Sequence, residues 1–150
     1  MLETFKQDDF FANNVDNLLN ANLSKMMEEH KQKKNIVTIA CVKVKDTRQY
    51  GEVAIKHMNK IVKFKEKAEC PKPKEGYINA GFYIFSPEIF DYLPEVTGPI
   101  SLEKDIFPEL ARTGRLGAFI PEFDKNQPIQ WFDTGTIERY AQVLEEWKGV

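Results

Sequence analysis

Apolar residues along this chain occur in two patterns, continuous runs and helical stripes. Residues 36–44 and 77–85 are almost entirely apolar and rich in β-branched or aromatic side chains, which is typical of strands covered on both faces. Residues 52–56 and 60–67 predict two further strands joined by the short connection 57–59, and apolar and charged side chains alternate in the second of them. Shorter apolar runs predict three more strands, at residues 10–14, 116–121 and 129–132.

Helical stripes occupy the spaces between these runs. Four helices are predicted, and they begin at Asn22, Ser86, Ser101 and Thr136. Each of these side chains can accept a hydrogen bond from the first helical turn, and Pro87 suits the first position of the second helix. Pro108 divides the third helix, and Gly114 ends it. The first helix places Leu23, Met26, Met27 and His30 on one face, and the last helix does so with Ile137, Tyr140, Val143, Leu144 and Trp147.

Strands interleaved with helices predict an α/β fold with an antiparallel element in its middle. The length of 150 residues fits a single domain, residues 1–150, that can build a hydrophobic core. Hydrophobic residues make up 42% of the chain and charged residues 29%, which indicates a globular protein rather than a disordered one.

The charge is nearly balanced, with 21 basic and 23 acidic residues and a net charge of -2. This balance argues against a nucleic-acid or membrane partner, because neither sign dominates. The lysine run Lys31, Lys33 and Lys34 is interpreted as the solvated end of a helix, where cations suit the helix dipole. No signal peptide and no run of bilayer-spanning length is apparent, so a cytoplasmic location is expected.

The two cysteines, Cys41 and Cys70, have no CxxC or Cys/His spacing around them. A disulfide framework and a zinc site are therefore not expected. Cys41 lies inside an apolar run and is predicted to be a buried thiol.

Several short segments carry polar or glycine residues where the predicted strands end. They are Asn14-Val15-Asp16, Tyr50-Gly51, Phe64-Lys65-Glu66-Lys67, Ile78-Asn79-Ala80-Gly81, Ser101 to Pro108 and Trp131-Phe132-Asp133-Thr134-Gly135-Thr136. In order and spacing this set resembles the second half of the sugar-1-phosphate nucleotidyltransferases, with the mannose- or heptose-1-phosphate guanylyltransferases as the nearest members. The resemblance extends from about Phe10 to Trp147. It implies a truncated, Rossmann-like nucleotide-diphospho-sugar transferase fold, a mixed sheet with flanking helices.

The resemblance also implies a divalent metal site, Mg²⁺, held by Asp16 and Asp133, which would make both aspartates catalytic. Asp16 follows a predicted strand, where a carboxylate can reach a ligand at the edge of the sheet. The alternatives from the residues alone are a turn role for Asp16 and a capping contact for Asp133 to the helix that begins near Thr136. Val15 stands where the family usually has glycine before the aspartate.

The remaining segments would bind the sugar 1-phosphate. By resemblance, Glu66 accepts hydrogen bonds from sugar hydroxyls, and Lys67 contacts the sugar phosphate and is catalytic. The alternative is that both belong to a charged surface strand, in which neighbouring side chains point to opposite faces.

Tyr50-Gly51 would present backbone groups to the sugar, or form a simple turn. Asn79 interrupts an apolar run, and its amide needs a partner, either a sugar hydroxyl or a neighbouring backbone group. Gly81 lies on the same side two residues on and would leave room for a ligand. Glu103 and Asp105 fall in a first helical turn, where acids are favoured by the helix dipole.

The glycine-rich loop that holds the nucleotide in this family is expected to be absent, since nothing before Phe10 resembles it. The resemblance therefore implies nucleotidyl transfer from an NTP to a sugar 1-phosphate, with this chain supplying the acceptor and metal side, and NTP binding only if the missing half is supplied. A non-catalytic sugar-phosphate-binding or interaction module is the alternative, so whether the chain alone is an enzyme stays open. A homo-oligomer or a partner chain is expected at the exposed sheet edge. A metal-dependent glycosyltransferase is disfavoured, because no clear Asp-x-Asp pair is present.

Overall fold

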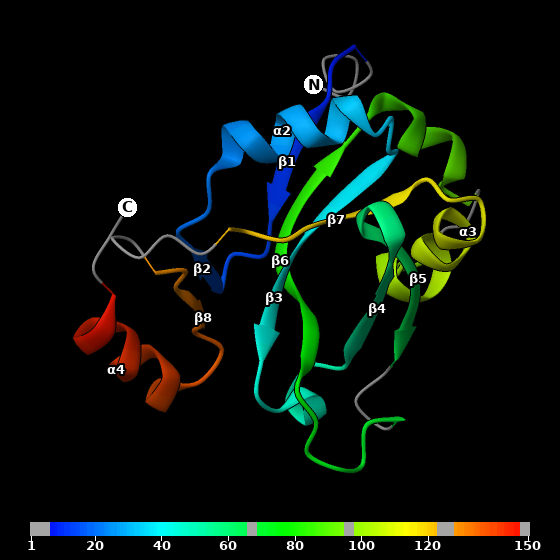
Figure 1. The fold of residues 1–150 in the computed structure, drawn as a ribbon. Coiled ribbons are helices and arrows are strands. Elements are labelled where there is room, and N and C mark those ends of the chain that lie inside the picture. Colours follow the sequence, from blue (N-terminus) through cyan, green and yellow to red (C-terminus); the bar gives the residue numbers. More distant parts are fainter. Residues whose placement is uncertain (1–6, 66–68, 95–97, 123–127, 148–150) are drawn as a thin grey trace.

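The computed structural model describes residues 7–65, 69–94, 98–122 and 128–147. Its main feature is a mixed six-stranded sheet in the order β1-β6-β3-β7-β5-β4 (Figure 1). The strands are β1 (Phe10–Asn13), β3 (Val37–Val44), β4 (Glu52–Lys56), β5 (Lys60–Lys65), β6 (Gly76–Phe85) and β7 (Leu116–Phe119). A separate two-stranded ribbon pairs β2 (Asn17–Leu19) with β8 (Trp131–Asp133). The predicted α/β class, a mixed sheet with flanking helices, is confirmed.

The β3 strand is the centre of the sheet and is buried on both faces, as its apolar run predicts. It pairs antiparallel with β6 and parallel with β7. Because side chains alternate along a strand, Ile39 and Cys41 enter one hydrophobic cluster while Ala40 and Val42 enter the other. Cys41 is a fully buried free thiol, and burial raises its pKa.

Helices cover both faces of this sheet. On one face α2 (Leu23–Gln32) packs through Met26, which has no exposed surface. On the other face Ile89, Phe107 and Leu110 pack from three successive helical segments. These segments are the 3₁₀-helix η4 (Pro87–Tyr92), the single π-turn η5 (Leu102–Ile106) and α3 (Phe107–Arg112).

The helix starts agree with the sequence except at Ser86. Asn22, Ser101 and Thr136 each accept a hydrogen bond from a backbone N–H three residues later. Ser86 makes no such bond, and the segment after it is 3₁₀-helical rather than α-helical. The helix predicted after Ser101 divides near Pro108 as expected, with its first part a π-turn.

Two connections contain short 3₁₀-helices. Residues 46–49, which lead out of β3, contain η1 (Thr47–Gln49), capped by the side chain of Asp46. The predicted tight connection between β4 and β5 is η2 (His57–Asn59), in which Met58 and Asn59 adopt positive φ angles of 59° and 55°. That connection returns the chain antiparallel onto β4.

The last helix, α4 (Ile137–Glu146), begins after Thr136 as predicted. Its expected apolar face is mostly exposed: Ile137 is 84%, Tyr140 55% and Leu144 70% exposed, and only Val143 is buried. The apolar periodicity is present, but α4 lies beside the two-stranded ribbon rather than against the sheet (Figure 1). Within the described ranges, no helix has the length and apolar character needed to cross a membrane.

We expect Gly117→Ala to destabilise the fold, because a β-carbon at Gly117 would stand 2.0 Å from Nδ2 of Asn35. Asn35 is buried, donates to Thr38 Oγ1 at 3.0 Å and accepts from Lys60 Nζ at 2.5 Å. Moving Asn35 strains both bonds, and overpacking of this kind costs about 1–3 kcal/mol. Urea denaturation measures the loss in free energy of unfolding.

Gly98→Ala is the matched control, since nothing lies within 4 Å of its β-carbon position. Its free energy of unfolding should change by no more than about 0.5 kcal/mol. Equal stability of the two variants would contradict the packing described around Asn35.

Candidate functional site

The short ribbon of β2 and β8 brings two distant carboxylates together. Asn17 pairs with Asp133 across the ribbon. Both the N–H and the hydroxyl of Thr134 donate to the backbone oxygen of Asp16, at 2.7 and 3.0 Å. A β-carbon on Gly135 would stand 3.0 Å from Oδ1 of Asp133 and 3.6 Å from Oδ2 of Asp16. The two aspartates predicted as metal ligands therefore lie on either side of one glycine.

Both carboxylate oxygens of Asp133 already have partners. The N–H of Gly135 donates to Oδ1 at 2.8 Å, and Nη1 of Arg139 donates to Oδ2 at 2.5 Å. The other terminal nitrogen of Arg139 donates to Gln49 Oε1 at 2.5 Å, and its guanidinium carbon lies 5.4 Å from the centre of the Tyr50 ring. Arg139 thus joins the aspartate to the segment that contains Tyr50, by charge and by a cation–π contact.

Three of the predicted substrate-binding residues, Tyr50, Gly51 and Asn79, line a small cavity. It has a volume of about 60 Å³ and is lined by Tyr50, Gly51, Glu52, Val53, Phe64, Lys65, Asn79 and Glu103. Gly51 has a φ of 81°, a conformation that glycine adopts without strain. The N–H groups of Tyr50 and Gly51 both donate to the Thr47 carbonyl, at 3.1 and 2.9 Å, so these two donors are engaged within the turn itself.

The amide of Asn79 is fully engaged by protein groups. Its Nδ2 donates to Tyr83 Oη and to Glu103 Oε1, both at 2.9 Å, and its Oδ1 accepts from the N–H of Gly81 at 2.9 Å. Burial raises the pKa of Tyr83, so its hydroxyl stays protonated. Of the two partners expected for Asn79, the neighbouring backbone group is the one present, and two side chains are added to it.

The space beside Gly81 is filled. Gly81 has a φ of 77°, and a β-carbon there would lie 2.4 Å from Asn17 Nδ2 and 3.0 Å from Asn14 Nδ2. The expected room for a ligand therefore holds two asparagine side chains. Both asparagines flank the turn that carries Asp16, so Gly81 allows that turn to approach β6 closely.

Tyr50 lies between the two aspartates and the cavity beside Asn79, and it contacts both regions. Its ring meets Trp131 edge to face, with centroids 5.1 Å apart, and Trp131 Nε1 donates to the Ala80 carbonyl at 2.9 Å. A cavity of about 430 Å³ extends from Tyr50 and Trp131 to Asp133 and Arg139. Tyr50 lines this cavity and also the small one beside Asn79.

Glu66 and Lys67 lie outside the described residues. They follow directly on Lys65, which ends β5 and forms an ion pair of 2.9 Å with Glu52. Lys74 reaches the other oxygen of Glu52 at 2.7 Å. These two lysines hold the pKa of Glu52 below its ordinary value, Lys65 having the larger effect.

Val15, the departure from the family pattern, has its side chain 99% exposed. Among the described residues other than glycine, only Lys34, Met58 and Asn59 have positive φ, so Val15 stands in ordinary backbone geometry. Its β-branched side chain points into solvent, and the turn that carries Asp16 forms without strain at this position.

The contacts of Arg139, Glu103 and Trp131 at this site are not among those predicted from the sequence. Arg139 has a readable signal: it stands in the first turn of a capped helix, where the helix dipole disfavours a cation. A residue placed against such a local preference indicates a specific partner, here Asp133. Glu103 agrees with the dipole and Trp131 with an apolar strand, so neither departs from its local pattern.

The donor set suits Mg²⁺ in kind and in number. Among the described residues, no group of three or more His, Cys, Asp or Glu side chains converges. Two carboxylates are nevertheless sufficient for Mg²⁺, which in proteins takes one or two of them together with water and substrate phosphate oxygens. The contact between Arg139 and Asp133 must open for Oδ2 of Asp133 to serve as a ligand.

The chain belongs to the nucleotidyl transferase family, whose model matches residues 1–148. The UTP–glucose-1-phosphate uridylyltransferase of Synechocystis is 31% identical over 142 residues, covering 93% of this chain and 35% of that protein. The mannose-1-phosphate guanylyltransferase of Mycobacterium tuberculosis is 29% identical over 139 residues, covering 91% and 36%.

A solved structure gives the same picture. HddC from Yersinia pseudotuberculosis superimposes with a TM-score of 0.75 at 26% identity, over 98% of this chain and 60% of that one. By the shares of 35% and 36% given above, this chain spans about a third of the length of the uridylyltransferase and guanylyltransferase relatives. The suspected family is confirmed.

We expect Arg139→Met to loosen α4, because Arg139 ties this helix to Asp133 and Gln49 while Val143 is its one buried residue. The ion pair is partly buried, with 31% and 19% of the two side chains exposed, and its loss should cost about 1 kcal/mol. Hydrogen exchange should accelerate at the amides of α4 and stay unchanged in β3.

Arg112→Met is the control for this substitution. Its ion pair with Glu109 lies within one helix and is largely exposed, so exchange in α3 should change little. Equal acceleration in the two helices would show that Arg139 does not anchor α4.

Proposed function

We propose that this chain supplies the acceptor and metal side of a sugar-1-phosphate nucleotidyltransferase. The reaction is NTP plus sugar 1-phosphate giving NDP-sugar plus pyrophosphate. The observation that carries the proposal is the contiguity of two predicted groups of residues. Asp16 and Asp133 converge at Gly135, and Arg139 connects Asp133 with Tyr50 at the cavity that Asn79 lines.

In this proposal Asn79 and Glu66 contact sugar hydroxyls, and Tyr50-Gly51 presents its backbone to the sugar. Lys67 neutralises the sugar phosphate, for which a compact ammonium is suited. A sugar binds by exchanging its hydroxyls for the contacts that Glu103 now makes with Asn79. Glu103 is therefore the side chain that moves aside or turns to the substrate.

The chemistry needs positioning and charge neutralisation rather than a protein nucleophile. An oxygen of the sugar phosphate attacks the α-phosphorus of the NTP in line, and the bond from that phosphorus to the bridging oxygen of the pyrophosphate leaving group breaks. Mg²⁺, when bound at Asp16 and Asp133, supplies charge neutralisation to the reacting phosphates. Lys67 does the same for the acceptor.

The nucleotide side is proposed to come from another segment or another chain. The relatives are about three times as long as this chain, which leaves ample length for that part. The β1 strand forms one edge of the described sheet, and an unpaired edge can accept a further strand. Pyrophosphate release from NTP and a sugar 1-phosphate should therefore require the added part, and turnover by this chain alone would contradict this arrangement.

A guanylyl transfer to a mannose- or heptose-type sugar 1-phosphate is the form we propose. It is supported by the order of the Phe64-Lys65-Glu66-Lys67 segment and by the mannose-1-phosphate guanylyltransferase among the relatives.

A non-catalytic sugar-phosphate-binding module is the second candidate. One observation favours it: Arg139 occupies an oxygen of the proposed metal ligand Asp133. Under this candidate the chain binds a sugar 1-phosphate, and pyrophosphate release stays absent even when the nucleotide side is added.

We expect Lys67→Ala to weaken the binding of mannose 1-phosphate roughly tenfold or more, because a charge-assisted hydrogen bond to phosphate is lost. Isothermal titration calorimetry with mannose 1-phosphate, and with glucose 1-phosphate in parallel, measures the effect. Lys63→Ala is the control, since Lys63 lies in β5 and pairs only loosely, at 3.6 Å, with Glu69. Binding that is equal in the two variants would remove Lys67 from the pocket.

We expect substitutions of Asp16 and of Arg139 to change the affinity for divalent ions in opposite directions. Asp16→Asn should weaken Mn²⁺ binding roughly tenfold, because a charged ligand becomes neutral. Arg139→Met should strengthen it, because Oδ2 of Asp133 is released from a competing cation. Electron paramagnetic resonance of free Mn²⁺, used in place of Mg²⁺, reports both changes, and weaker binding by the Arg139 variant would contradict the proposed competition.

A further inference from the structure

A pocket that the proposed function does not use lies at the other end of the central strands, away from Tyr50. It has a volume of about 340 Å³ and is lined by Asp9, His30, Lys31, Lys34, Asn35, Ser86, Glu88 and Arg115. These residues come from the C-terminal end of α2, the starts of β1, β3 and β7, the end of β6, and η4. Tyr50 and Gly51, in contrast, follow the other end of β3 (Figure 1). No lining residue is common to this pocket and the two cavities around Tyr50.

The three lysines at the end of α2, Lys31, Lys33 and Lys34, differ in their partners. Lys33 forms an ion pair with Glu29 one turn earlier in its own helix. Lys31 and Lys34 line the pocket, and neither has a carboxylate partner among the described residues. The carbonyls of His30 and Lys31 accept from backbone N–H groups at the end of α2, so they are not directed at a ligand. The helix dipole alone explains cations at this end, but it does not explain a cavity beside them.

The remaining charges leave the pocket with an excess of one positive charge. Arg115 donates through Nη2 to Glu88 Oε2 at 2.7 Å. Asp9 faces Nε2 of His30 at 3.7 Å. Burial lowers the pKa of His30, an effect that Asp9 opposes, so the ring is neutral near pH 7. Two carboxylates thus face three cations, with Lys31 and Lys34 left for a ligand.

Two buried polar groups of the pocket residues lack partners. Within the described part of the chain, Oγ of Ser86 and Nε of Arg115 have no hydrogen bond although both atoms are buried. Ser86 is only 7% exposed, and it does not cap the helix that follows it. A buried donor without a partner is costly, and such groups in native proteins usually meet a ligand or a water.

We propose that this pocket binds an oxyanion, the phosphate group of a small metabolite. A phosphate offers three terminal oxygens, which match the ammonium groups of Lys31 and Lys34 at the pocket surface. The Ser86 hydroxyl and Arg115 Nε are covered, and in the proposal they become donors when their side chains turn toward the ligand. Arg115 keeps its contact with Glu88 through Nη2, because Nε is a separate donor. Asp9 and Glu88 limit the charge that the pocket accepts to that of one phosphate group, and the volume admits a small monoester rather than a nucleotide triphosphate.

The test uses inorganic phosphate on the whole chain at fixed pH and ionic strength. NMR follows the ring protons of the two histidines, of which His30 lines the pocket and His57 lies in η2. Phosphate in the millimolar range should shift the His30 resonances saturably and leave those of His57 in place. It should also raise Tm, because a ligand that binds only the folded state stabilises it.

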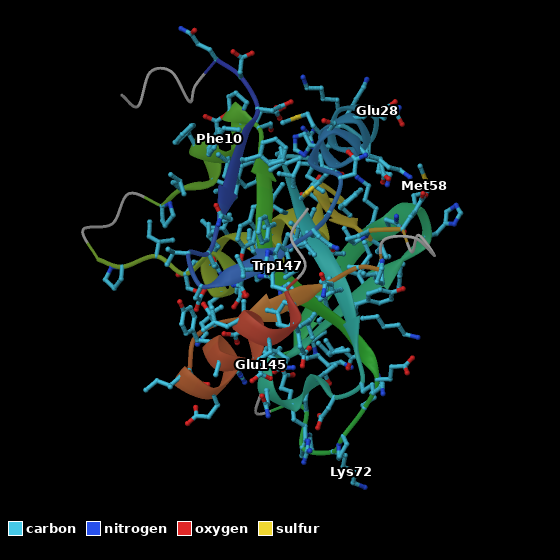
Figure 2. The ribbon with its side chains drawn as sticks, turned by 90° about the vertical axis from the view of Figure 1, so that its left-hand side faces the viewer. Phe10, Glu28, Met58, Lys72, Glu145 and Trp147 are labelled. Atoms are coloured by element: carbon cyan, nitrogen blue, oxygen red, sulfur yellow. The ribbon has the colours of Figure 1, made fainter. Side chains whose placement is uncertain are left out.

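Three variants identify the donors. Lys34→Gln should raise the dissociation constant for phosphate roughly tenfold, since a charge-assisted contact is lost. Ser86→Ala should weaken binding several-fold while Tm without phosphate does not fall, because the hydroxyl it removes has no partner. Lys72→Gln is the charge-matched control: Lys72 is exposed and lies at the end of the molecule away from Glu28 of α2 (Figure 2). It should leave binding unchanged.

Four outcomes would overturn the proposal. The His30 resonances fail to saturate, or Lys34→Gln and Lys72→Gln weaken binding equally, or citrate binds more tightly than phosphate at equal ionic strength. Loss of phosphate binding in Lys67→Ala with retention in Lys34→Gln would also overturn it, since it would assign the phosphate to the proposed sugar-phosphate site. Equal affinity for mannose 1-phosphate in Lys67→Ala and Lys63→Ala bears on the proposed function alone.

Discussion

The candidate site depends on the pairing of two three-residue strands, β2 and β8, which lie more than one hundred residues apart in sequence. This ribbon sets Asp16 and Asp133 beside Gly135 and places Trp131 where its indole reaches the Ala80 carbonyl. A two-stranded ribbon is at best marginally stable by itself in water. Here the buried Leu19, the ring of Trp131 and the side chain of Asn20, bonded to the backbone of residues 128 and 130, hold it against the main sheet.

The sheet was predictable because its strands carry their own signals. β3 and β6 are apolar on both faces, and a run of that length has few alternatives to a covered strand. The helix starts at Asn22, Ser101 and Thr136 follow from side-chain chemistry that acts over three residues. The positions of the site residues at strand ends were likewise readable, and the structure brings Asp16 to Asp133 and Tyr50 to Asn79. What these groups bind stays a prediction.

The errors have physical causes in non-local contacts. β2 is not among the predicted strands, because it has only three residues and pairs with β8, far along the chain. Ser86 has the residue type of a helix cap, yet its N–H bonds the Ile36 carbonyl across the sheet edge and its hydroxyl caps nothing. In α4 the apolar stripe is real, but periodicity specifies a face without specifying what covers it. Gly81 was interpreted as room for a ligand, and the asparagines that fill it come from a different segment.

Arg139 gives the site a built-in cation. Two carboxylates that converge at one glycine repel each other, and a guanidinium on Asp133 reduces that repulsion. The same guanidinium lies over Tyr50 and bonds Gln49, both in the segment that leads to the cavity beside Asn79. Displacing Arg139 from Asp133 therefore alters contacts on both sides at once. In the proposed enzyme, metal binding and the fit of the sugar would be coupled through Arg139. A metal that displaces Arg139 from Asp133 would also alter the contacts of Arg139 with Gln49 and Tyr50.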